Sequence, residues 1–230
     1  MKRSEINTLM RQADQFIQQR GFYLPPFAHW SPNDWRNKGR EAREIVETKL
    51  GWDITDFGSG DFPRCGLLLF TIRNGRPDNW KTQTGKLYAE KILIVDEHQV
   101  TPYHFHWNKM EDIINRGGGE LKLQLFNSTA AETLDQENPV QVLIDGVENS
   151  FSAGSIVTLQ PGESISLTPD LYHQFWAERG KTLVGEVSLV NDDEKDNRFL
   201  QSQPRFPAID EDEEPLYLLC SDYPRYYKYR

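Results

Sequence analysis

The feature that most constrains the fold of this 230-residue chain is a series of short β-rich runs that begins near Cys65. Gly, Pro, Asn and Asp separate the runs at a spacing of about ten residues. We predict strands at residues 67–73, 87–95, 100–107, 121–126, 140–144, 156–159, 164–167, 173–177 and 182–190. Asn74-Gly75, Asp145-Gly146 and Pro161-Gly162 supply turn signals between them. This pattern favours an all-β core, closed as a barrel or stacked as a sandwich, over a parallel sheet with crossover helices.

Two amphipathic segments precede the β-rich region. The first carries an apolar stripe at helical spacing, made by Ile6, Leu9, Met10, Ala13, Phe16 and Ile17. We expect Ser4 to cap this helix and Gly21 to end it. A second helix is expected to start at Ser31-Pro32 and to continue until Gly51 closes it. The chain should therefore combine an N-terminal helical extension with a β-core.

The composition shift along the chain predicts three regions. Residues 1–60 form the helical extension, residues 61–191 form the β-core, and residues 192–230 form a C-terminal extension that packs on the core or at a dimer interface. The last region contains the acidic run 210–214 followed by an aromatic tail. An acidic run is usually a solvated surface, although one of its carboxylates could fold back over a site. A homodimer is our expectation.

The net charge limits the kinds of binding partner, and the cysteine usage indicates the cell compartment. The formal net charge of −9 argues against nucleic acid or an anionic membrane, because neither suits an acidic chain without a dense basic run. No stretch of the sequence approaches the roughly 18 apolar residues of a membrane-spanning helix. Cys65 and Cys220 are far apart and not in a CxxC arrangement, so we expect free thiols and a cytoplasmic protein. The composition is compatible with a small neutral or weakly charged ligand.

The tripeptide His104-Phe105-His106 predicts a metal site assembled on β-strands. Side chains two residues apart on a strand leave the same face of the sheet, so both imidazoles can reach one ion. Glu111 lies five residues after His106, close enough to return to that ion after a short turn. His173 would complete the set from another strand.

These residues resemble the metal motifs of the cupin superfamily, whose small barrels hold one metal with three histidines and a glutamate. In the second motif, Asp170 and Ala177 stand where cupins usually carry glycine and asparagine. A longer segment, 101–119, reads TPYHFHWNKMEDIINRGGG and resembles the metal-motif segment of the D-lyxose isomerase family. Segments 89–95, 169–173, 185–188 and the tail from Arg205 are similar to that family too.

The resemblance implies a cupin-type β-barrel (jelly-roll) with an N-terminal α-helical extension. It also implies a metal-dependent aldose-ketose isomerase, typically with Mn²⁺, that interconverts D-lyxose with D-xylulose and often D-mannose with D-fructose. A site of nitrogen and oxygen ligands also suits Fe²⁺, Co²⁺, Ni²⁺ or Zn²⁺. The predicted ligands are His104, His106, Glu111 and His173.

Aldose-ketose isomerisation needs an electrophile for the sugar oxygens, which the metal would supply by stabilising a cis-enediolate, and a base for the C–H proton. Glu186 is a candidate base if it faces the barrel interior, and Glu211 or Glu213 from the acidic run could instead close over the mouth. Lys109 and Lys91 are candidates to hold a sugar oxygen or to stabilise charge. Proton transfer and hydride shift both stay open.

Two other classes fit the same ligands. A cupin oxygenase would use the open metal positions for dioxygen and substrate, whereas a non-catalytic sugar-binding module would hold a structural metal. Oxygen uptake separates the first class from an isomerase, because isomerisation consumes none. Neither the preferred sugar nor the physiological metal follows from the sequence.

Overall fold

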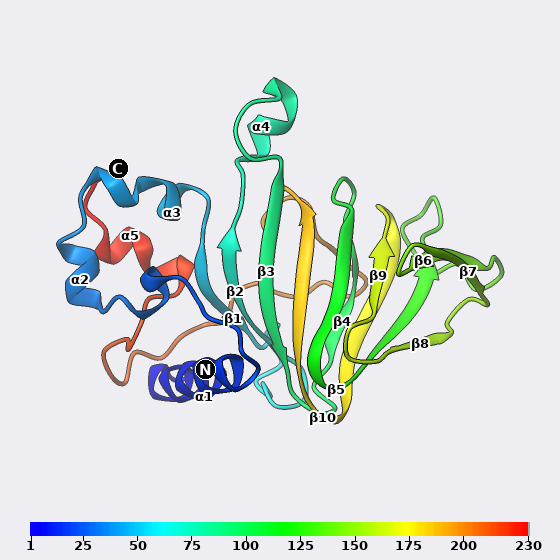
Figure 1. Ribbon diagram of the computed structural model, residues 1–230, viewed down its shortest axis with the longest axis horizontal. Helices are drawn as coiled ribbons and strands as arrows, with labels where there is room; N and C mark the ends of the chain where they lie inside the picture. The colour runs from blue at the N-terminus through cyan, green and yellow to red at the C-terminus, as the bar shows by residue number, and fades with distance from the viewer. Residues whose placement is uncertain (230) are drawn as a thin grey trace.

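The computed structural model describes residues 1–229, in which the β-strands are mostly antiparallel and most of the helices gather on one side (Figure 1). The strands are β1 (Gly51–Thr55), β2 (Leu67–Arg73), β3 (Tyr88–Val95), β4 (Thr101–Phe105), β5 (Glu111–Asn127), β6 (Val140–Ile144), β7 (Val147–Phe151), β8 (Ile156–Leu159), β9 (Ser164–Leu167), β10 (Leu171–Leu189) and β11 (Arg198–Phe199). The α-helices are α1 (Arg3–Gln19), α2 (Pro32–Arg36), α3 (Arg43–Glu47), α4 (Pro77–Thr82) and α5 (Tyr223–Tyr226), with 3-10 turns at Pro26–His29, Arg40–Ala42 and Cys220–Asp222. Among the described residues, none of these helices has the length and apolar character needed to cross a membrane.

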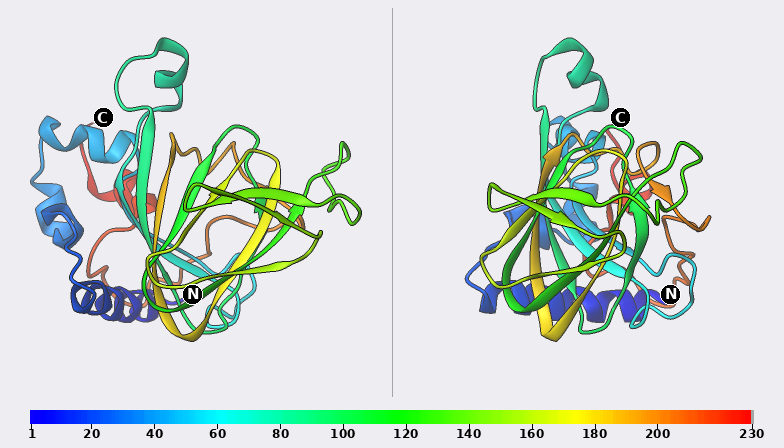
Figure 2. Two further views of the ribbon diagram at one scale, coloured as in Figure 1. Left: turned by 45° about the vertical axis from the view of Figure 1, so that its right-hand side comes forward. Right: turned by 90° about the vertical axis from the view of Figure 1, so that its right-hand side faces the viewer.

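The two longest strands, β5 and β10, pair with each other and take part in two sheets. The first half of β5 and the second half of β10 lie in a sheet of order β1-β2-β3-β10-β5-β9-β6-β7. Their other halves lie between β4 and β8, with β11 beyond β4. Because both strands change sheet, the two sheets face each other and close into a barrel (Figure 2).

Glycine marks the corner where β5 and β10 pass from one sheet to the other. The register of their pairing shifts between Glu178 and Thr182. A Cβ atom on Gly118 would lie 2.2 Å from the carbonyl oxygen of Lys181, which no real side chain tolerates. The absence of a side chain therefore permits the close approach and the bend.

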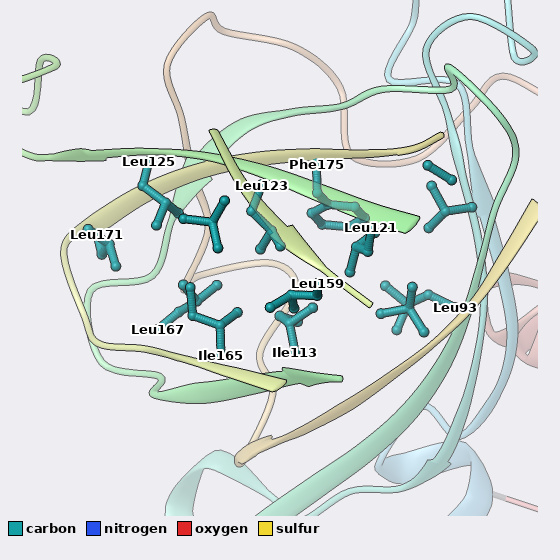
Figure 3. Packing of buried hydrophobic residues seen from close by; sticks show 14 of the residues in the cluster. Leu93, Ile113, Leu121, Leu123, Leu125, Leu159, Ile165, Leu167, Leu171 and Phe175 are labelled. Carbon is teal, nitrogen blue, oxygen red and sulfur yellow. The ribbon is translucent and has the colours of Figure 1, made fainter. Parts of the chain in front are cut away.

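Apolar side chains, most of them aliphatic, fill the space between the two sheets (Figure 3). The labelled members of this core are Leu93, Ile113, Leu121, Leu123, Leu125, Leu159, Ile165, Leu167, Leu171 and Phe175. Leu121, Leu123 and Leu125 occupy alternate positions along β5, as the two-residue period of a strand requires. Burial of each such side chain stabilises the fold by roughly 2 kcal/mol.

Helix α1 covers the outer face of β1, β2 and β3. On β2, Leu67 and Leu69 point into the barrel, while Leu68 and Phe70 belong to an outer cluster that includes Ile6, Met10, Ala13 and Ile17 of α1. A strand covered on both faces needs apolar side chains at successive positions, which is why residues 67–70 form an unbroken apolar run. On β6, by contrast, Val140 is buried and Gln141 is exposed, because only one face is covered.

The all-β core with an N-terminal α-helix is confirmed, and β2, β6, β8 and β9 have the predicted bounds. The Asp145-Gly146 turn is also confirmed, because both residues adopt positive φ between β6 and β7. The runs at 173–177 and 182–190 were predicted as two strands but form one, β10, because the corner bends without interrupting the pairing. Strands β1, β7 and β11 were not predicted, nor was the first part of β5, residues 111–120.

Three local predictions were wrong. Ser4 does not cap α1, which begins one residue earlier, and its amide and hydroxyl instead donate to Asp212. The second helix does not run to Gly51: α2 has the predicted Ser31 cap, but it ends at Arg36 and Gly51 opens β1. Asn74-Gly75 forms no two-residue hairpin, because α4 is inserted between β2 and β3. The side-chain amide of Asn74 instead donates to the backbone oxygen of Asn191 and accepts from its backbone N–H.

Candidate functional site

Two strands of the barrel bring three imidazoles together. His104 on β4 is aligned with His173 on β10, and the next aligned pair is Thr101 with Phe175. The positions on β4 are three residues apart where those on β10 are two apart, so β4 carries one extra residue, a bulge, in this interval. His106 lies one residue beyond the end of β4. The antiparallel pairing of β4 with β10 therefore brings all three imidazole rings close together.

Each of these imidazoles has its Nδ1 atom against a backbone carbonyl oxygen. The Nδ1–O distances are 2.9 Å from His104 to Pro102, 2.6 Å from His106 to Asp196 and 3.0 Å from His173 to Leu171. A carbonyl oxygen can only accept, so Nδ1 carries the proton in each ring. The Nε2 atom of a neutral ring is then left with a lone pair.

The Nε2 lone pairs face one another. His104 Nε2 and His173 Nε2 are 3.1 Å apart, and His106 Nε2 is buried without a hydrogen-bond partner in the described chain. Burial lowers the pKa of His104 well below its usual value, and the neighbouring imidazoles lower it further, so this ring is neutral. Facing lone pairs repel unless a cation lies between them. The geometry therefore fits a divalent metal ion.

Glu111 adds an oxygen to this nitrogen cluster. Its Oε1 atom lies 3.4 Å from His106 Nε2 and 3.2 Å from His173 Nε2. The ligating atoms of the histidines alone lie within 4.8 Å of one another. All four predicted ligands, His104, His106, Glu111 and His173, are thus brought together. Imidazole and carboxylate ligands suit a first-row divalent ion.

A second carboxylate, Glu186, lies beside the cluster between two buried lysines. Lys109 Nζ is 2.7 Å from Glu111 Oε2 and 2.9 Å from Glu186 Oε1. Lys91 Nζ is 3.2 Å from the same Glu186 Oε1, which also accepts a 3.3 Å hydrogen bond from Ser188 Oγ. In the described part of the chain these contacts leave Glu186 Oε2 free. Three of the predicted catalytic residues are therefore present at the site.

The charges of this cluster stabilise one another against the cost of burial. Burial alone would lower the pKa of Lys109, but Glu111 and Glu186 raise it above its ordinary value. Burial alone would raise the pKa of Glu186, but Lys109 and Lys91 together lower it. Near neutral pH the site therefore holds an ionised Glu186 beside a protonated Lys109.

A cavity opens beside these groups, with about 470 Å³ of empty space when the open solvent at its mouth is included. One part of its wall is charged and another part is aliphatic and aromatic. Its lining residues are Phe57, Leu67, Leu69, Lys91, Leu93, Thr101, His104, His106, Lys109, Glu111, Ile113, Phe175, Glu186, Asp193, Asn197, Phe199 and Arg205. Most of the wall comes from strands of the barrel core, and the remainder from Phe57, the loop between β4 and β5, and the segment after β10.

That C-terminal segment supplies cavity residues that we did not predict. Asp193, Asn197 and Arg205 line the cavity. Arg205 Nη2 lies 2.6 Å from Asp53 Oδ2 and 3.5 Å from Asp193 Oδ1, whereas Arg205 Nη1 is buried without a partner among residues 1–229. These residues follow the last long strand in an irregular stretch, where no periodicity reports which side chains point inward.

Asp196 was also missed, and it positions two site residues. Its backbone oxygen accepts the hydrogen bond from His106 Nδ1. Its carboxylate accepts 3.0 Å hydrogen bonds from the backbone amides of Asn108 and Lys109. The loop between β4 and β5 is thereby held in the conformation that presents His106 and Lys109 to the cavity.

Glu211 and Glu213, proposed from the sequence as alternative bases, do not reach the cavity. Glu211 accepts 2.8 Å hydrogen bonds from Arg3 Nε and Nη2, and Glu213 accepts a 2.6 Å hydrogen bond from Asn7 Nδ2. The acidic run packs along α1, on the outside of the barrel, because α1 presents these donors there. Neither glutamate is in the cavity wall.

Comparison with known proteins gives one consistent result. The family model for D-lyxose isomerase matches residues 1–223. The chain is 51% identical to the D-lyxose/D-mannose isomerase of Serratia proteamaculans, with 98% of this chain and 99% of that protein covered. It is 50% identical to the D-lyxose/D-mannose isomerase of Escherichia coli O157:H7, with 97% and 98% covered.

Solved structures of L-ribose isomerases share the fold. The enzyme of Geodermatophilus obscurus aligns with a TM-score of 0.60 at 16% identity, covering 91% of this chain and 98% of that one. The enzyme of Cellulomonas parahominis with L-psicose aligns with a TM-score of 0.59 at 14% identity, again covering 91% and 98%.

Proposed function

This chain belongs to the D-lyxose isomerase family, and from that premise we propose that it interconverts D-lyxose with D-xylulose and D-mannose with D-fructose. The reaction is an intramolecular oxidoreduction. It moves one hydrogen from C2 to C1 and one hydroxyl proton from O2 to O1, so a base near the two carbons and polar groups near the two oxygens are sufficient in principle.

His104, His106, His173 and Glu111 would hold the metal ion, and we propose Mn²⁺ among the divalent ions that suit these ligands. When bound, the ion supplies an electrophile that polarises O1 and O2 of the open-chain sugar. The buried Nδ1–carbonyl contacts fix the ring orientations in advance, so binding requires little rearrangement of the protein.

Glu186 is the proposed base. Its Oε1 atom is already occupied by donors from Lys91, Lys109 and Ser188, which orients Oε2 as the free proton acceptor. Oε2 would take the proton from C2 of the aldose and return it to C1 of the resulting enediolate. Because the carboxylate stays ionised near neutral pH, it is in the form that accepts a proton.

Lys109 and Lys91 would stabilise the negative charge that develops on the sugar oxygens. Lys109 lies between Glu111 and Glu186, so its ammonium is placed between the proposed metal position and the base. Both lysines are almost fully buried, at 3% and 4% exposure, where a fixed positive charge acts through a weakly screening environment. Arg205 and Asn197 would contact hydroxyl groups further along the sugar.

One observation carries this proposal: an ionised carboxylate with a free oxygen lies in the same cavity wall as a set of facing imidazole lone pairs. A proton acceptor next to a site for an electrophile is what enediol chemistry needs. An oxygenase would need the open metal positions but not a lysine-oriented base.

The test is an isotope experiment with metal-stripped and Mn²⁺-restored protein in heavy water. D-Lyxose, D-mannose and other aldoses are incubated, and ketose formation, deuterium beside the carbonyl and oxygen uptake are measured. We expect ketose only from the restored protein and no oxygen uptake. Deuterium in the product supports proton transfer by a base that exchanges with solvent, whereas turnover without deuterium would favour a hydride shift or a shielded proton. Oxygen-dependent turnover would reject the isomerase.

We further propose a homodimer located in the cytoplasm. Support for the first comes from apolar side chains that are about 40–50% exposed, namely Tyr88 on β3, Leu143 on β6, Val187 on β10 and Met110 in the loop before β5. Support for the second comes from Cys65 and Cys220, which are free thiols. Sedimentation analysis tests the oligomer, and fractionation of cells tests the location.

A further inference from the structure

The cavity wall contains a hydroxyl group that the chemistry above does not use. Four buried side-chain polar atoms lack a hydrogen-bond partner within residues 1–229, namely Thr101 Oγ1, His106 Nε2, Gln203 Nε2 and Arg205 Nη1. Three of these atoms belong to residues that line the cavity. The His106 atom faces the proposed metal position. Arg205 is assigned above to hydroxyl groups of the sugar, so the Thr101 hydroxyl is left unexplained.

The bulge in β4 determines where this hydroxyl points. In a regular strand Thr101 and His104, three residues apart, would face opposite sides of the sheet. The extra residue in β4 aligns them with Phe175 and His173, which are two residues apart and share the inner face of β10. Thr101 is consequently turned into the barrel, where it is 2% exposed and lines the cavity.

The spacing places Thr101 away from the reacting end of a bound sugar. Two residues along a strand correspond to about 7 Å, so Thr101 lies roughly that far from His104 along the inner face. An open-chain sugar that presents O1 and O2 at the imidazole cluster would extend its remaining carbons toward this part of the wall. Phe175, which is aligned with Thr101 and also lines the cavity, cannot hydrogen-bond to a hydroxyl group.

We propose that Thr101 Oγ1 is a specificity-determining contact, which binds one hydroxyl group on C4, C5 or C6 of the sugar. The inference rests on the isomerase activity proposed above and adds a residue to it. A buried hydroxyl without a partner is unfavourable, and a substrate hydroxyl removes that cost when it binds. A sugar that lacks the contacted hydroxyl would leave Thr101 unpaired and would be selected against.

The experiment compares wild type, Thr101→Val, Thr101→Ser and Thr182→Val. Valine keeps the shape of threonine without its hydroxyl, and serine keeps the hydroxyl. Thr182→Val is the matched control, because Thr182 is a fully buried threonine on β10 that already hydrogen-bonds to Gly180 O and lies outside the cavity wall. Each protein is assayed with D-lyxose, with D-mannose and with mannose analogues deoxygenated at C4, C5 or C6.

We expect Thr101→Val to lower kcat/KM about tenfold for the sugar that makes the contact, mostly through KM, while Thr101→Ser and Thr182→Val stay near wild type. For the analogue that lacks the contacted hydroxyl, wild type and Thr101→Val should give the same kcat/KM. Equal values for all four proteins on every sugar would overturn the inference. So would an equal loss in Thr101→Val on every deoxy analogue, because that pattern reflects altered folding rather than a sugar contact.

Binding of the unreactive polyol D-mannitol, measured by calorimetry on the metal-loaded protein, separates this inference from the proposed function. Weaker binding to Thr101→Val than to wild type supports the contact even if no sugar is isomerised, in which case the isomerase proposal fails by itself. Equal D-mannitol affinity in the two proteins, or no binding to either, counts against the contact.

Discussion

Two clusters of buried charge in this molecule differ in one respect. Arg3 on α1 is fully buried, and its guanidinium makes four hydrogen bonds of 2.8–3.0 Å to the carboxylates of Glu211 and Asp222. Lys109 in the cavity is also held between two carboxylates, those of Glu111 and Glu186. In the Arg3 cluster every nitrogen of the guanidinium is paired. In the cavity cluster Glu186 keeps one oxygen free, and the same wall holds unpaired atoms of His106, Thr101 and Arg205.

The difference separates a structural cluster from a functional one. A closed set of charge-assisted hydrogen bonds fixes the C-terminal extension to α1 and leaves nothing to bind a ligand. An open set costs stability in the free protein, because unpaired polar atoms are buried, and this cost is relieved only when a ligand supplies partners. The contrast predicts that substitutions in the two clusters will affect different measurements.

The largest effect is expected for Glu186→Gln. The variant loses the proposed proton acceptor while keeping the shape of the side chain, so kcat should fall about 10³-fold. Metal content, measured by elemental analysis, should stay that of the wild type. The matched control is Glu178→Gln on the same strand, where Glu178 contacts Lys122 and Trp176 outside the cavity wall. A kcat close to wild type in Glu186→Gln would place the base elsewhere.

The next effect is expected for Arg3→Met, and it should appear in stability instead of turnover. Methionine cannot pair with Glu211 or Asp222, so the free energy of unfolding should fall by about 3 kcal/mol. Urea denaturation measures this change. At a temperature where the variant is folded, kcat/KM should match the wild type. A large loss of kcat/KM without a loss of stability would contradict the division between the clusters.

Acid should weaken the cavity wall through Asp193. Burial alone would raise the pKa of Asp193, but Lys91 and Arg205 lower it strongly. Because the folded-state pKa lies below the unfolded value, this group stabilises the fold above about pH 4 and loses that contribution as the pH falls further. The free energy of unfolding, measured by urea denaturation at a series of pH values from 5 downward, should therefore fall less steeply with pH in Asp193→Asn than in the wild type. This dependence is the acid slope.

Glu211→Gln provides the comparison for that slope. Its hydrogen bonds from Arg3 lower the pKa of Glu211 as well, but the side chain is 38% exposed and solvent screens it. The change in acid slope should therefore be smaller in Glu211→Gln than in Asp193→Asn. A larger change in Glu211→Gln would mean that the exterior cluster, and not the cavity, dominates the acid response.

The smallest effect is expected for Glu213→Gln. Glu213 is exposed, and glutamine can still accept the hydrogen bond from Asn7 Nδ2. Both kcat/KM and the thermal midpoint should match the wild type within repeat error. A loss of activity would revive the idea that the acidic run closes over the cavity.

The sequence was most informative where the chain is regular. His104 and His106 could be assigned to one face from their spacing alone. The condition set for Glu186, that it faces the barrel interior, is met, because Glu186 lines the cavity. Thr101 could not be assigned in this way, because the bulge in β4 reverses its parity and no residue pattern announces the bulge. Arg205 could not be assigned because it lies in an irregular segment.

The same limit applies to the fold. Strands with alternating or continuous apolar runs, such as β2 and β6, were predicted at their bounds. The corner at Gly118 was not, because a glycine predicts a break as readily as a bend that keeps the pairing. Asn74-Gly75 has the composition of a hairpin turn, yet the Asn74 side chain is used to hold the segment after β10. Long-range contacts decided these cases.

The hydrogen bonds of Arg3 join residues separated by more than 200 positions. During synthesis on the ribosome, α1 leaves the exit tunnel first, but its arginine has no carboxylate partner until residues 211 and 222 have emerged. Arg205, which lines the cavity, is likewise synthesised only after β10. The barrel strands can pair well before this, so a nascent chain that ends after β10 would hold the imidazole cluster without the segment that completes its cavity.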